Sequence, residues 1–503
     1  MTGSLKTRIK SVSLIFACGT ALFSDGYANG IIGSVNTLLT RTYGKEALAR
    51  HNYSTVVNSL GFAGTVVGML LFGYLSDKVG RKFGMMSAAG IVVVFSCLSA
   101  ASSGANGSVG GLLSMLSAMR FFLGIGVGAE YPCGSVSASE QSEEPGINRR
   151  AWHRWLGLST IVMLVFGFSI AAFIPLVLYW IFGPNHLPVI WRLSLGLGAV
   201  PALAVFLWRL NMDEPVRYKK DSMRNARIPY NLVFRRYGGQ LAAISIIWFL
   251  FDIIIELTAM LNDVFGIYSS TVLNNITGGS TDLAIIFGWN VVINLLYVPG
   301  ALLGAFVVDY LGPKNTLASI SIIGLVLQAI VGCFMSGFYS QLTKHIAAFS
   351  LLYGLFLSFG EFGAGLCTFI LASKACPTAI RGQFFGAAAA SGKVGAFIGI
   401  WIFPPIIKAF GGSESLRGNT GPFWIGSGLA LLNAVIALCF IHPLTANGII
   451  QEDQKFREYL EAHGYDTSQM GLADNHDLLT IVDHDSAVQD KKGDLEEDNG
   501  LVI

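Results

Sequence analysis

The chain has 503 residues, of which 53% are hydrophobic and only 13% are charged, and its mean hydropathy is +0.58. Soluble domains carry about 25% charged residues, so this composition excludes an ordinary soluble protein and indicates a membrane protein. The seven cysteines are scattered through apolar segments without the spacing of metal ligands. We therefore predict neither a metal site nor a disulfide framework.

The N-terminal sequence MTGSLKTRIK leads into an apolar stretch that has no convincing small-residue cleavage site. We therefore expect a first spanning helix from Ser11 onward and not a cleaved signal. A bilayer is crossed by about 20 apolar residues, and on this criterion the sequence predicts twelve transmembrane helices. The predicted spans are 11–33, 55–75, 84–103, 110–132, 155–182, 190–210, 240–270, 283–308, 315–337, 346–372, 383–408 and 421–442.

A long polar stretch runs from Asn211 to Gly238 and separates the sixth predicted span from the seventh. A linker in this position divides a twelve-helix protein into two halves of six helices. The predicted domains are an N-terminal half (1–210), a cytoplasmic linker (211–239), a C-terminal half (240–442) and a tail (443–503).

The tail differs in charge from the rest of the chain. It has fourteen acidic residues against four basic ones, although the net charge of the whole chain is only +2. Acidic segments with few apolar residues stay solvated. We therefore expect the tail to be cytoplasmic and largely disordered after a short helix near Gln451–His463.

Lysine and arginine residues set the orientation of membrane proteins because they are retained on the cytoplasmic side. With both termini in the cytoplasm, the predicted inside segments carry 20 of them and the outside loops carry 6. Three glycosylation sequons, at Asn52, Asn106 and Asn275, fall in loops that this topology places outside. Both patterns favour cytoplasmic termini, and we expect a multi-pass protein of the plasma membrane.

An internal repeat relates the two halves. The chain reads GYLSDKVGRK after the second span and AFVVDYLGPK after the eighth, so Asp77 and Asp309 are equivalent with an offset of 232 residues. Repeats of this kind build many secondary transporters. We expect Asp77, Arg81 and Asp309 to act as gate latches that break as the halves rock. In the alternative, these charges only set the topology.

The motif G-x-x-x-D-x-x-G-R-K between the second and third spans resembles the signature of the major facilitator superfamily. Six further segments are similar to the fungal glycerophosphoinositol and glycerophosphocholine permeases, a branch close to the phosphate:proton symporters. These segments are SDGYANG (24–30), GIGVGAEYP (124–132), WFLFD (248–252), GIYSSTV (266–272), TAIRGQFFG (378–386) and SGKVGA (391–396). The resemblance covers all twelve spans and implies an all-α membrane protein of two six-helix halves.

Seven ionisable residues lie inside predicted spans, where each costs at least ~2.5–3.5 kcal/mol if it faces lipid. They are Asp25, Arg120, Glu130, Asp252, Glu256, Glu361 and Lys393. Arg120 offers a planar fork of donors that suits phosphate, and Lys393 is a compact cation from the other half. We expect the two to clamp a phosphate or a phosphodiester. In the alternative, each only neutralises a carboxylate.

Arg120 and Glu130 lie ten residues apart, about 15 Å along a straight helix, so they cannot pair with each other. Buried carboxyls suit proton coupling, because their protonation responds to a nearby cation or to an arriving anion. The residues expected to couple protons are Asp25, Glu130, Asp252 and Glu361. The resemblance to phosphate symporters places Asp25, Arg120, Glu130, Tyr131, Trp248, Asp252 and Lys393 along the substrate and proton route. Tyr131 and Trp248 would bind substrate, or serve only as packing aromatics.

Two segments depart from the permease pattern. The permease branch continues with a GPGD-like turn where this chain reads GEFGAGLCTF from Gly360, without that proline and aspartate. If that turn shapes the headgroup pocket, the substrate differs from a simple glycerophosphodiester.

In the seventh span, the segment IIIELTAMLNDVF lengthens the predicted helix to about 31 residues, either as a kinked helix or as a gene-model artefact. Glu256 shares a face with Asp252 but belongs to this insertion.

The sequence therefore predicts a proton-coupled secondary transporter, not an enzyme, that imports glycerophosphodiesters or phosphate by alternating access. Its partners would be a small anionic organic substrate, protons and the lipid bilayer, and we expect a monomer without cofactor, metal or nucleic acid. The run Gly124-x-Gly126-x-Gly128 opens no βαβ unit and predicts close helix packing, not dinucleotide binding. The alternatives are a transporter of another organic metabolite and, less favoured, a nutrient sensor that binds without transporting.

Overall fold

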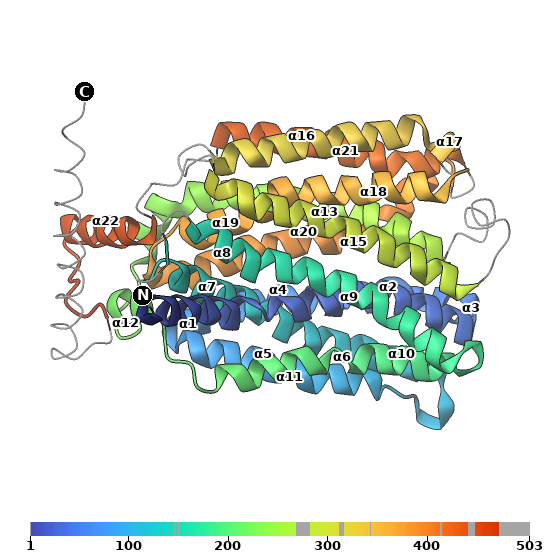
Figure 1. Ribbon diagram of the computed structural model, residues 1–503, viewed down its shortest axis with the longest axis horizontal. Helices are drawn as coiled ribbons and strands as arrows, with labels where there is room; N and C mark the ends of the chain where they lie inside the picture. Colours follow the sequence, from blue (N-terminus) through green and yellow to red (C-terminus); the bar gives the residue numbers. More distant parts are fainter. Residues whose placement is uncertain are drawn as a thin grey trace.

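The structure is a computed structural model. It describes the whole chain except residues 1, 145–146, 149–150, 268–281, 311–315, 343, 413–414, 441–447 and 472–503. Every regular element in the described part is helical, and the long helices lie side by side in one bundle (Figure 1). The N-terminus lies at one end of the bundle. We call this end the terminus side and the opposite end the far side.

The helices of each half follow one another along the chain. The first half forms α1 (Thr2–Gly19), α2 (Leu22–Tyr43), α3 (Lys45–Ala49), α4 (Tyr53–Lys78), α5 (Arg81–Ala100), α6 (Val109–Glu130), α7 (Val136–Ser142), α8 (Trp152–Ser159), α9 (Ile161–Phe182), α10 (Leu187–Gly196) and α11 (Ala199–Arg209). The second half forms α13 (Tyr230–Ile267), α15 (Leu283–Tyr310), α16 (Thr316–Gly337), α17 (Tyr339–Leu342), α18 (Ile346–Gly360), α19 (Leu366–Lys374), α20 (Arg381–Ala409) and α21 (Leu416–Phe440). α12 (Val216–Asp221) lies between the halves, and α22 (Gly448–Ala462) follows them.

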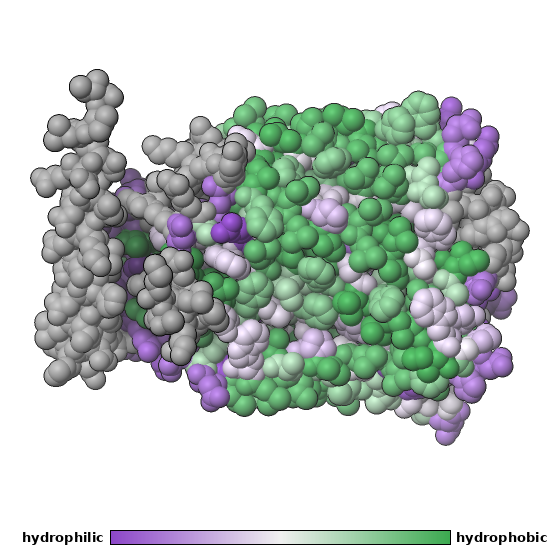
Figure 2. All heavy atoms as spheres, viewed as in Figure 1, coloured by the Kyte–Doolittle hydropathy of each residue, from purple (hydrophilic) through white to green (hydrophobic). Residues whose placement is uncertain are grey.

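Eleven helical segments of the described chain are long and apolar enough to cross a membrane. They correspond to the second to twelfth predicted spans, whereas the first, 11–33, is not among them. The middle of the bundle presents a broad apolar surface, and hydrophilic residues gather at the far side (Figure 2). Large apolar side chains are exposed on the bundle, such as Leu303 at 58% and Leu438 at 69%. Exposed apolar surface of this extent is expected for contact with lipid.

The first predicted span is divided between two helices, so the prediction of one helix over 11–33 is wrong. α1 and α2 are separated at Thr20–Ala21. At the end of α11, Arg209 donates from Nε to the carbonyl of Ala17 (2.9 Å) and from Nη2 to that of Cys18 (2.5 Å). The last carbonyl groups of a helix need donors from outside it. Arg209 supplies them at this point and stabilises the end of α1.

The seventh predicted span corresponds to α13, which is one helix of 38 residues. It runs through the inserted segment IIIELTAMLNDVF without interruption. It also begins at Tyr230, ten residues before the predicted span, so the last part of the predicted linker 211–239 is helical. The insertion therefore lengthens a helix and leaves its register unbroken.

Glycines bring helices into close contact within and between the halves. A Cβ atom at Gly124 of α6 would lie 2.2 Å from the carbonyl oxygen of Gly61 in α4. This confirms that the glycine run packs helices, since small residues allow backbones to approach. Between the halves, a Cβ atom at Gly386 of α20 would lie 2.4 Å from the carbonyl oxygen of Met69 in α4. The two halves therefore meet backbone to backbone at this point.

Candidate functional site

Two π-helical turns interrupt long helices at matching places in the two halves. η3 (Tyr131–Ser135) joins α6 to α7, and η6 (Glu361–Gly365) joins α18 to α19. Their starts are 230 residues apart, close to the offset between Asp77 and Asp309. Such turns insert one extra residue, redirect the side chains beside it and occur often at functional sites. Tyr131 and Glu361 both reach a cavity between the halves.

We call this cavity the inner chamber. It has a volume of about 70 Å³. Six of the predicted substrate and proton residues line it: Asp25, Tyr131, Trp248, Asp252, Glu361 and Lys393. Glu256 lines it as well, and Phe62 and Phe369 add aromatic surface from the two halves. Residues from distant parts of the sequence are thus brought together at one place.

The lysine of the inner chamber forms an ion pair. Lys393 Nζ lies 3.0 Å from Asp252 Oδ2 and 5.8 Å from the centre of the Tyr131 ring. The Tyr131 hydroxyl donates to Asp25 Oδ2 at 2.5 Å, and Asn29 Nδ2 donates to Asp25 Oδ1 at 2.5 Å. Lys393 thus faces carboxylates from both halves, so its interactions change when either carboxylate takes up a proton.

Glu361 forms no ion pair with the described residues. Its Oε1 accepts a hydrogen bond from the hydroxyl of Tyr297 at 2.8 Å. Its Oε2 is buried and has no hydrogen-bond partner in the described part of the chain. A buried carboxyl oxygen without a partner is a position where a proton can bind.

A second cavity adjoins the inner chamber and has a volume of about 140 Å³. The two share part of their walls, including Asn29, Phe62, Phe168, Glu256 and Tyr297. Four asparagines from both halves line the second cavity, so we call it the amide chamber; they are Asn29, Asn58, Asn290 and Asn294. Arg120 lines the amide chamber, and Lys393 lines the inner one. The two predicted cations therefore serve adjoining cavities and not the same one.

Arg120 has a charge that no carboxylate pairs with among the described residues. Its Nη1 donates to the carbonyl of Ala28 at 2.8 Å, and its Nε has no hydrogen-bond partner there. The side chain is nevertheless almost entirely buried, at 2% exposed. A buried guanidinium with an open donor favours an anion or another strong acceptor beside it.

Glu130 does not line either chamber. It is buried and pairs with Arg209, whose Nη1 lies 2.8 Å from Oε1 and 2.9 Å from Oε2. The sequence interpretation missed this partner, because Arg209 ends the sixth span and resembles a charge that only sets topology. A useful signal is its position directly after the apolar run VFLW, where an arginine side chain can turn back into the bundle.

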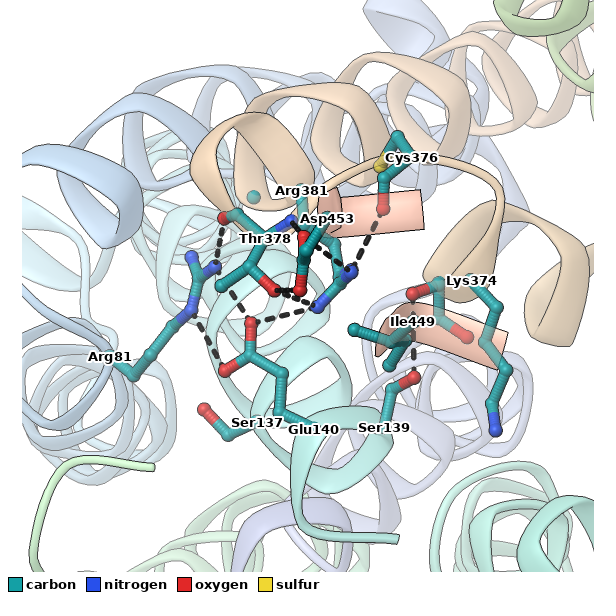
Figure 3. A network of polar contacts seen from close by, with 12 residues as sticks. Arg81, Ser137, Ser139, Glu140, Lys374, Cys376, Thr378, Arg381, Ile449 and Asp453 are labelled. Carbon is teal, nitrogen blue, oxygen red and sulfur yellow. Dashed lines mark hydrogen bonds and ion pairs between the residues drawn. The ribbon is translucent and has the colours of Figure 1, made fainter. Parts of the chain in front are cut away.

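On the terminus side, charged residues of both halves form a buried network that we call the terminus-side cluster (Figure 3). Glu140 of α7 lies between two arginines, 3.0 Å from Arg81 and 3.3 Å from Arg381. Asp77 Oδ1 accepts from Arg81 Nη1 at 2.6 Å and from the backbone N–H of Gly382 at 2.9 Å. Because Arg381 and Gly382 begin α20 in the second half, the cluster holds the two halves together at this end.

Asp309 makes the equivalent contact from the second half to the first. Its Oδ2 accepts from the backbone N–H of Arg154 at 2.7 Å, and its Oδ1 lies 2.9 Å from His153 Nδ1. Asp77 thus meets the start of α20, and Asp309 meets the start of α8. Each aspartate lies where the positive end of a helix of the other half attracts it. This equivalence agrees with the repeat found in the sequence.

The helix α22 packs against the terminus-side cluster. Asp453 accepts from the backbone N–H of Thr378 at 2.6 Å and from its hydroxyl at 2.8 Å. Glu143 of the first half accepts from the backbone N–H of Ile449 at 3.0 Å. The short helix expected near 451–463 is therefore present and contacts both halves. The residues after 471 lie outside the described part of the chain.

Asp453 is a titratable group of this contact and lies outside the spans. Burial raises the pKa of Asp453 to about 7, the nearby carboxylate of Asp221 adds to the shift, and Arg381 opposes it. Arg457 in turn holds Asp221 at 2.9 Å. We therefore predict that the contact between α22 and the bundle depends on pH near neutrality.

The sequence matches a family model described as sugar (and other) transporter over residues 12–228 and 219–452. The two matches cover both halves. The chain belongs to this transporter family. Its fold agrees, because the proton:xylose symporter XylE bound to 6-bromo-6-deoxy-D-glucose superposes with a TM-score of 0.68 at 18% identity, covering 90% of this chain and 99% of that one. The predicted all-helical transporter fold is therefore confirmed, whereas the count of twelve spans and the cytoplasmic position of the termini stay predictions.

Other members of the family have names that bear on the cargo. A glycerophosphocholine permease of Candida albicans is 42% identical over 93% of this chain and 86% of its own length. A glycerophosphodiester transporter of the same organism is 39% identical over 97% and 89%. A glycerophosphoinositol transporter of Saccharomyces cerevisiae is 32% identical over 93% and 86%. The resemblance to fungal glycerophosphodiester permeases is confirmed, and this family member is a transporter and not an enzyme.

Two of the three sequons of this family member lie on exposed turns. Asn52 and Asn106 are exposed and have positive φ angles of 54° and 52°. They precede α4 and α6. Asn275 lies outside the described residues. Glycosylation at the three asparagines stays a prediction.

Proposed function

We propose that the protein is a proton-coupled symporter that imports glycerophosphodiesters or phosphate by alternating access. The observation that carries the proposal is the inner chamber, where Lys393 of one half faces carboxylates of both halves. Relatives named as a glycerophosphocholine permease and a glycerophosphodiester transporter, at 42% and 39% identity, support the choice of cargo.

Lys393 is the proposed phosphate ligand of the inner chamber. Its ammonium group lies 3.0 Å from Asp252, and a phosphoryl oxygen can replace that carboxylate oxygen as its partner. Trp248 lines the same space and can donate its indole N–H, and Tyr131 can donate its hydroxyl once a protonated Asp25 no longer needs it. Arg120 adds a second cation from the adjoining chamber. A phosphodiester therefore finds donors on several sides.

Protons balance the charge that the substrate brings. A monoanionic phosphodiester about 4 Å from one carboxylate is repelled by about 4 kcal/mol at an effective dielectric constant of 20. Protonation of that carboxylate removes the repulsion, so proton and substrate enter together. The proposed proton carriers are Asp25, Asp252 and Glu361, because all three line the inner chamber. Glu130 is left out of this route, since it lines neither chamber.

Alternating access requires the terminus-side cluster to break and re-form. Asp77, Glu140 and Asp309 each form a hydrogen bond or ion pair with a residue of the opposite half. Together with the glycine contact at Gly386, these bonds close the terminus side in this structure. Asp77, Arg81 and Asp309 are therefore the proposed latches, and the substrate would leave the chamber when they release.

Import to the cell interior requires the terminus side to face the cytoplasm. We therefore propose cytoplasmic termini in the plasma membrane, in keeping with the excess of lysine and arginine on that side. Asn52 and Asn106 would then face outward, where glycosylation takes place. The two chambers lie within one chain, so a monomer is sufficient for transport.

Uptake into liposomes tests the proposal. Purified protein should accumulate labelled glycerophosphocholine, glycerophosphoinositol or phosphate under an inward proton gradient, and an uncoupler should abolish the accumulation. Folded protein that takes up none of the three would contradict the cargo. Accumulation that survives the uncoupler would contradict the proton coupling.

The second candidate is a transporter of another organic metabolite. It is favoured because the segment after Gly360 lacks the GPGD-like turn and instead has Glu361, whose Oε2 has no partner among the described residues. A competition panel of phosphodiesters, phosphate and polyols against one tracer separates the cargoes. Binding and uptake measured side by side identify a sensor, which would bind without transporting.

A further inference from the structure

The amide chamber is chemically different from the inner chamber. Its polar wall consists of carboxamides and one guanidinium, together with Glu256 and the hydroxyls of Tyr297 and Tyr353. Carboxamides both donate and accept hydrogen bonds, whereas ammonium and carboxylate groups do only one of the two. A phosphate group, which mainly accepts, does not need such a wall. An alcohol does, because each hydroxyl both donates and accepts.

The hydrogen bonds inside the chamber leave complementary atoms open. Asn58 accepts from Asn36 Nδ2 at 3.0 Å, and its own Nδ2 donates to no described residue. Asn294 Nδ2 donates to Asn290 Oδ1 at 2.9 Å, and the Oδ1 of Asn294 accepts from no described residue. Arg120 lines the same wall, although its unpartnered Nε is itself buried. Asn58 and Asn294 thus line one space from opposite halves, each with an amide atom that has no described partner.

The rest of the wall fits a carbon skeleton. Phe62, Phe168, Ile255 and Ile400 line the chamber and offer apolar surface. Arg120 and Glu256 bring charges of opposite sign to this wall. The carboxamides beside them favour a group that has hydroxyls.

The two chambers share Asn29, Phe62, Phe168 and Tyr297, so a single molecule can extend from one into the other. We propose that the amide chamber is the subsite for the hydroxyl-bearing alcohol of a phosphodiester, and that Asn58, Asn290 and Asn294 recognise its hydroxyls. The inference rests on the proposed function, which puts the phosphate in the inner chamber. Glycerol and inositol share the required chemistry, and the experiment distinguishes them.

A pair of diesters that differ only in hydroxyls tests the subsite. Glycerophosphocholine and propylphosphocholine have the same phosphate and the same choline, but the second lacks the two glycerol hydroxyls. In competition for uptake of labelled glycerophosphocholine, wild-type protein should prefer the hydroxylated diester at least about tenfold, since each hydrogen bond contributes about 1 kcal/mol or more. Asn294→Leu should reduce the preference to about twofold and leave propylphosphocholine inhibition unchanged.

Glycerophosphoinositol identifies the alcohol. If Asn294→Leu and Asn58→Leu weaken inhibition by glycerophosphocholine and by glycerophosphoinositol equally, the glycerol group occupies the amide chamber. If they weaken inhibition by glycerophosphoinositol alone, the inositol group occupies it. Asn433→Leu is the matched control, because Asn433 is buried, donates to the carbonyl of Ile247 at 3.1 Å and lines neither chamber. It should keep the wild-type preference.

Three results would overturn the inference. The first is that the wild-type protein transports diesters without preferring the hydroxylated one, and that glycerophosphoinositol inhibits the asparagine variants as strongly as the wild type. The second is that Asn294→Leu and the milder Asn294→Ser lose inhibition by all diesters equally, although size-exclusion chromatography shows that both variants are folded. The third is the same loss of preference in Asn433→Leu. Wild-type protein that transports none of these compounds would instead contradict the proposed function.

Discussion

The two π-helical turns are equivalent in backbone and different in charge. In the first half, Glu130 precedes the turn and is held by Arg209 away from the chambers. In the second half, Glu361 begins the turn, reaches the inner chamber and has one oxygen without a partner in the described part of the chain. The carboxyl beside the π-helical turn therefore stabilises helix packing in one half and can take up a proton in the other. The two repeated halves keep the same backbone geometry, but the carboxyl next to the turn has a different role in each.

The largest effect is expected from removing the anchor. Arg209→Met leaves Glu130 buried without its cation and the carbonyls of Ala17 and Cys18 without donors. Breaking a buried pair from one side costs about 3–5 kcal/mol. Thermal unfolding in detergent should show a large loss of stability, whereas Glu361→Gln should unfold near the wild-type temperature. Similar stability of the two variants would end the distinction between the turns.

Glu361→Gln tests the reactive side of the comparison. The amide keeps an acceptor for Tyr297 but cannot exchange a proton. We expect accumulation driven by a proton gradient to fall at least about tenfold, and exchange of substrate without a gradient to stay within about twofold, in liposomes. Glu130→Gln, as the matched variant, should reduce accumulation and exchange by the same factor. Unaltered accumulation in Glu361→Gln would contradict its role.

A second pair of equivalent residues extends the comparison to the latches. Asp77 accepts from Arg81 and from the starting N–H groups of α20, whereas Asp309 accepts from Arg154 and contacts His153. Asp77→Asn should therefore increase the population of protein that is open on the terminus side about tenfold more than Asp309→Asn does. The reason is that hydrogen bonds to charged groups contribute about 1.5–3 kcal/mol each.

Labelling of Cys376 measures this opening, because its side chain is buried beside the cluster. A membrane-impermeant maleimide should react faster in Asp77→Asn than in Asp309→Asn, in protein whose other six cysteines are replaced by alanine. Equal rates would show that the two latches contribute equally. A rate below that of the wild type in either variant would contradict the latch role.

The smallest effect concerns the docking of α22. The pKa of Asp453 is about 7 in the folded protein and higher than its ordinary value of 3.8, so the uncharged form is favoured when the helix is docked. The stabilising contribution is complete below about pH 4 and is lost as the pH rises to about 7. The protection of the α22 amides, which is the intrinsic exchange rate divided by the observed rate at the same pH, should therefore decrease between pH 5 and 7. In Asp453→Asn this decrease should disappear; if it persisted, another group would be responsible.

Composition and periodicity were sufficient for most of the spans and for the repeat, because apolar length and the charges at helix ends are local signals. The candidate residues chosen from the sequence also include six that line the inner chamber. The partner of Glu130 was missed, since pairing with Arg209 depends on how α11 turns back against α1. The amide chamber was missed too. Asn58 and Asn294 are uncharged, and nothing in a single sequence separates an asparagine that lines a cavity from one that packs.

The contact of Gly73, Gly382 and Gly386 between α4 and α20 has a mechanical consequence. A Cβ atom at Gly382 would lie 2.8 Å from the carbonyl oxygen of Gly73 and 2.7 Å from Asp77 Oδ1, so a side chain there would meet both the main chain of α4 and the charged cluster. A Cβ atom at Gly386 would lie 2.4 Å from the carbonyl oxygen of Met69, so even one methyl group there would push α4 and α20 apart. Because Asp77 binds the start of α20 across the same contact, the separation would also weaken the terminus-side cluster without changing any of its residues.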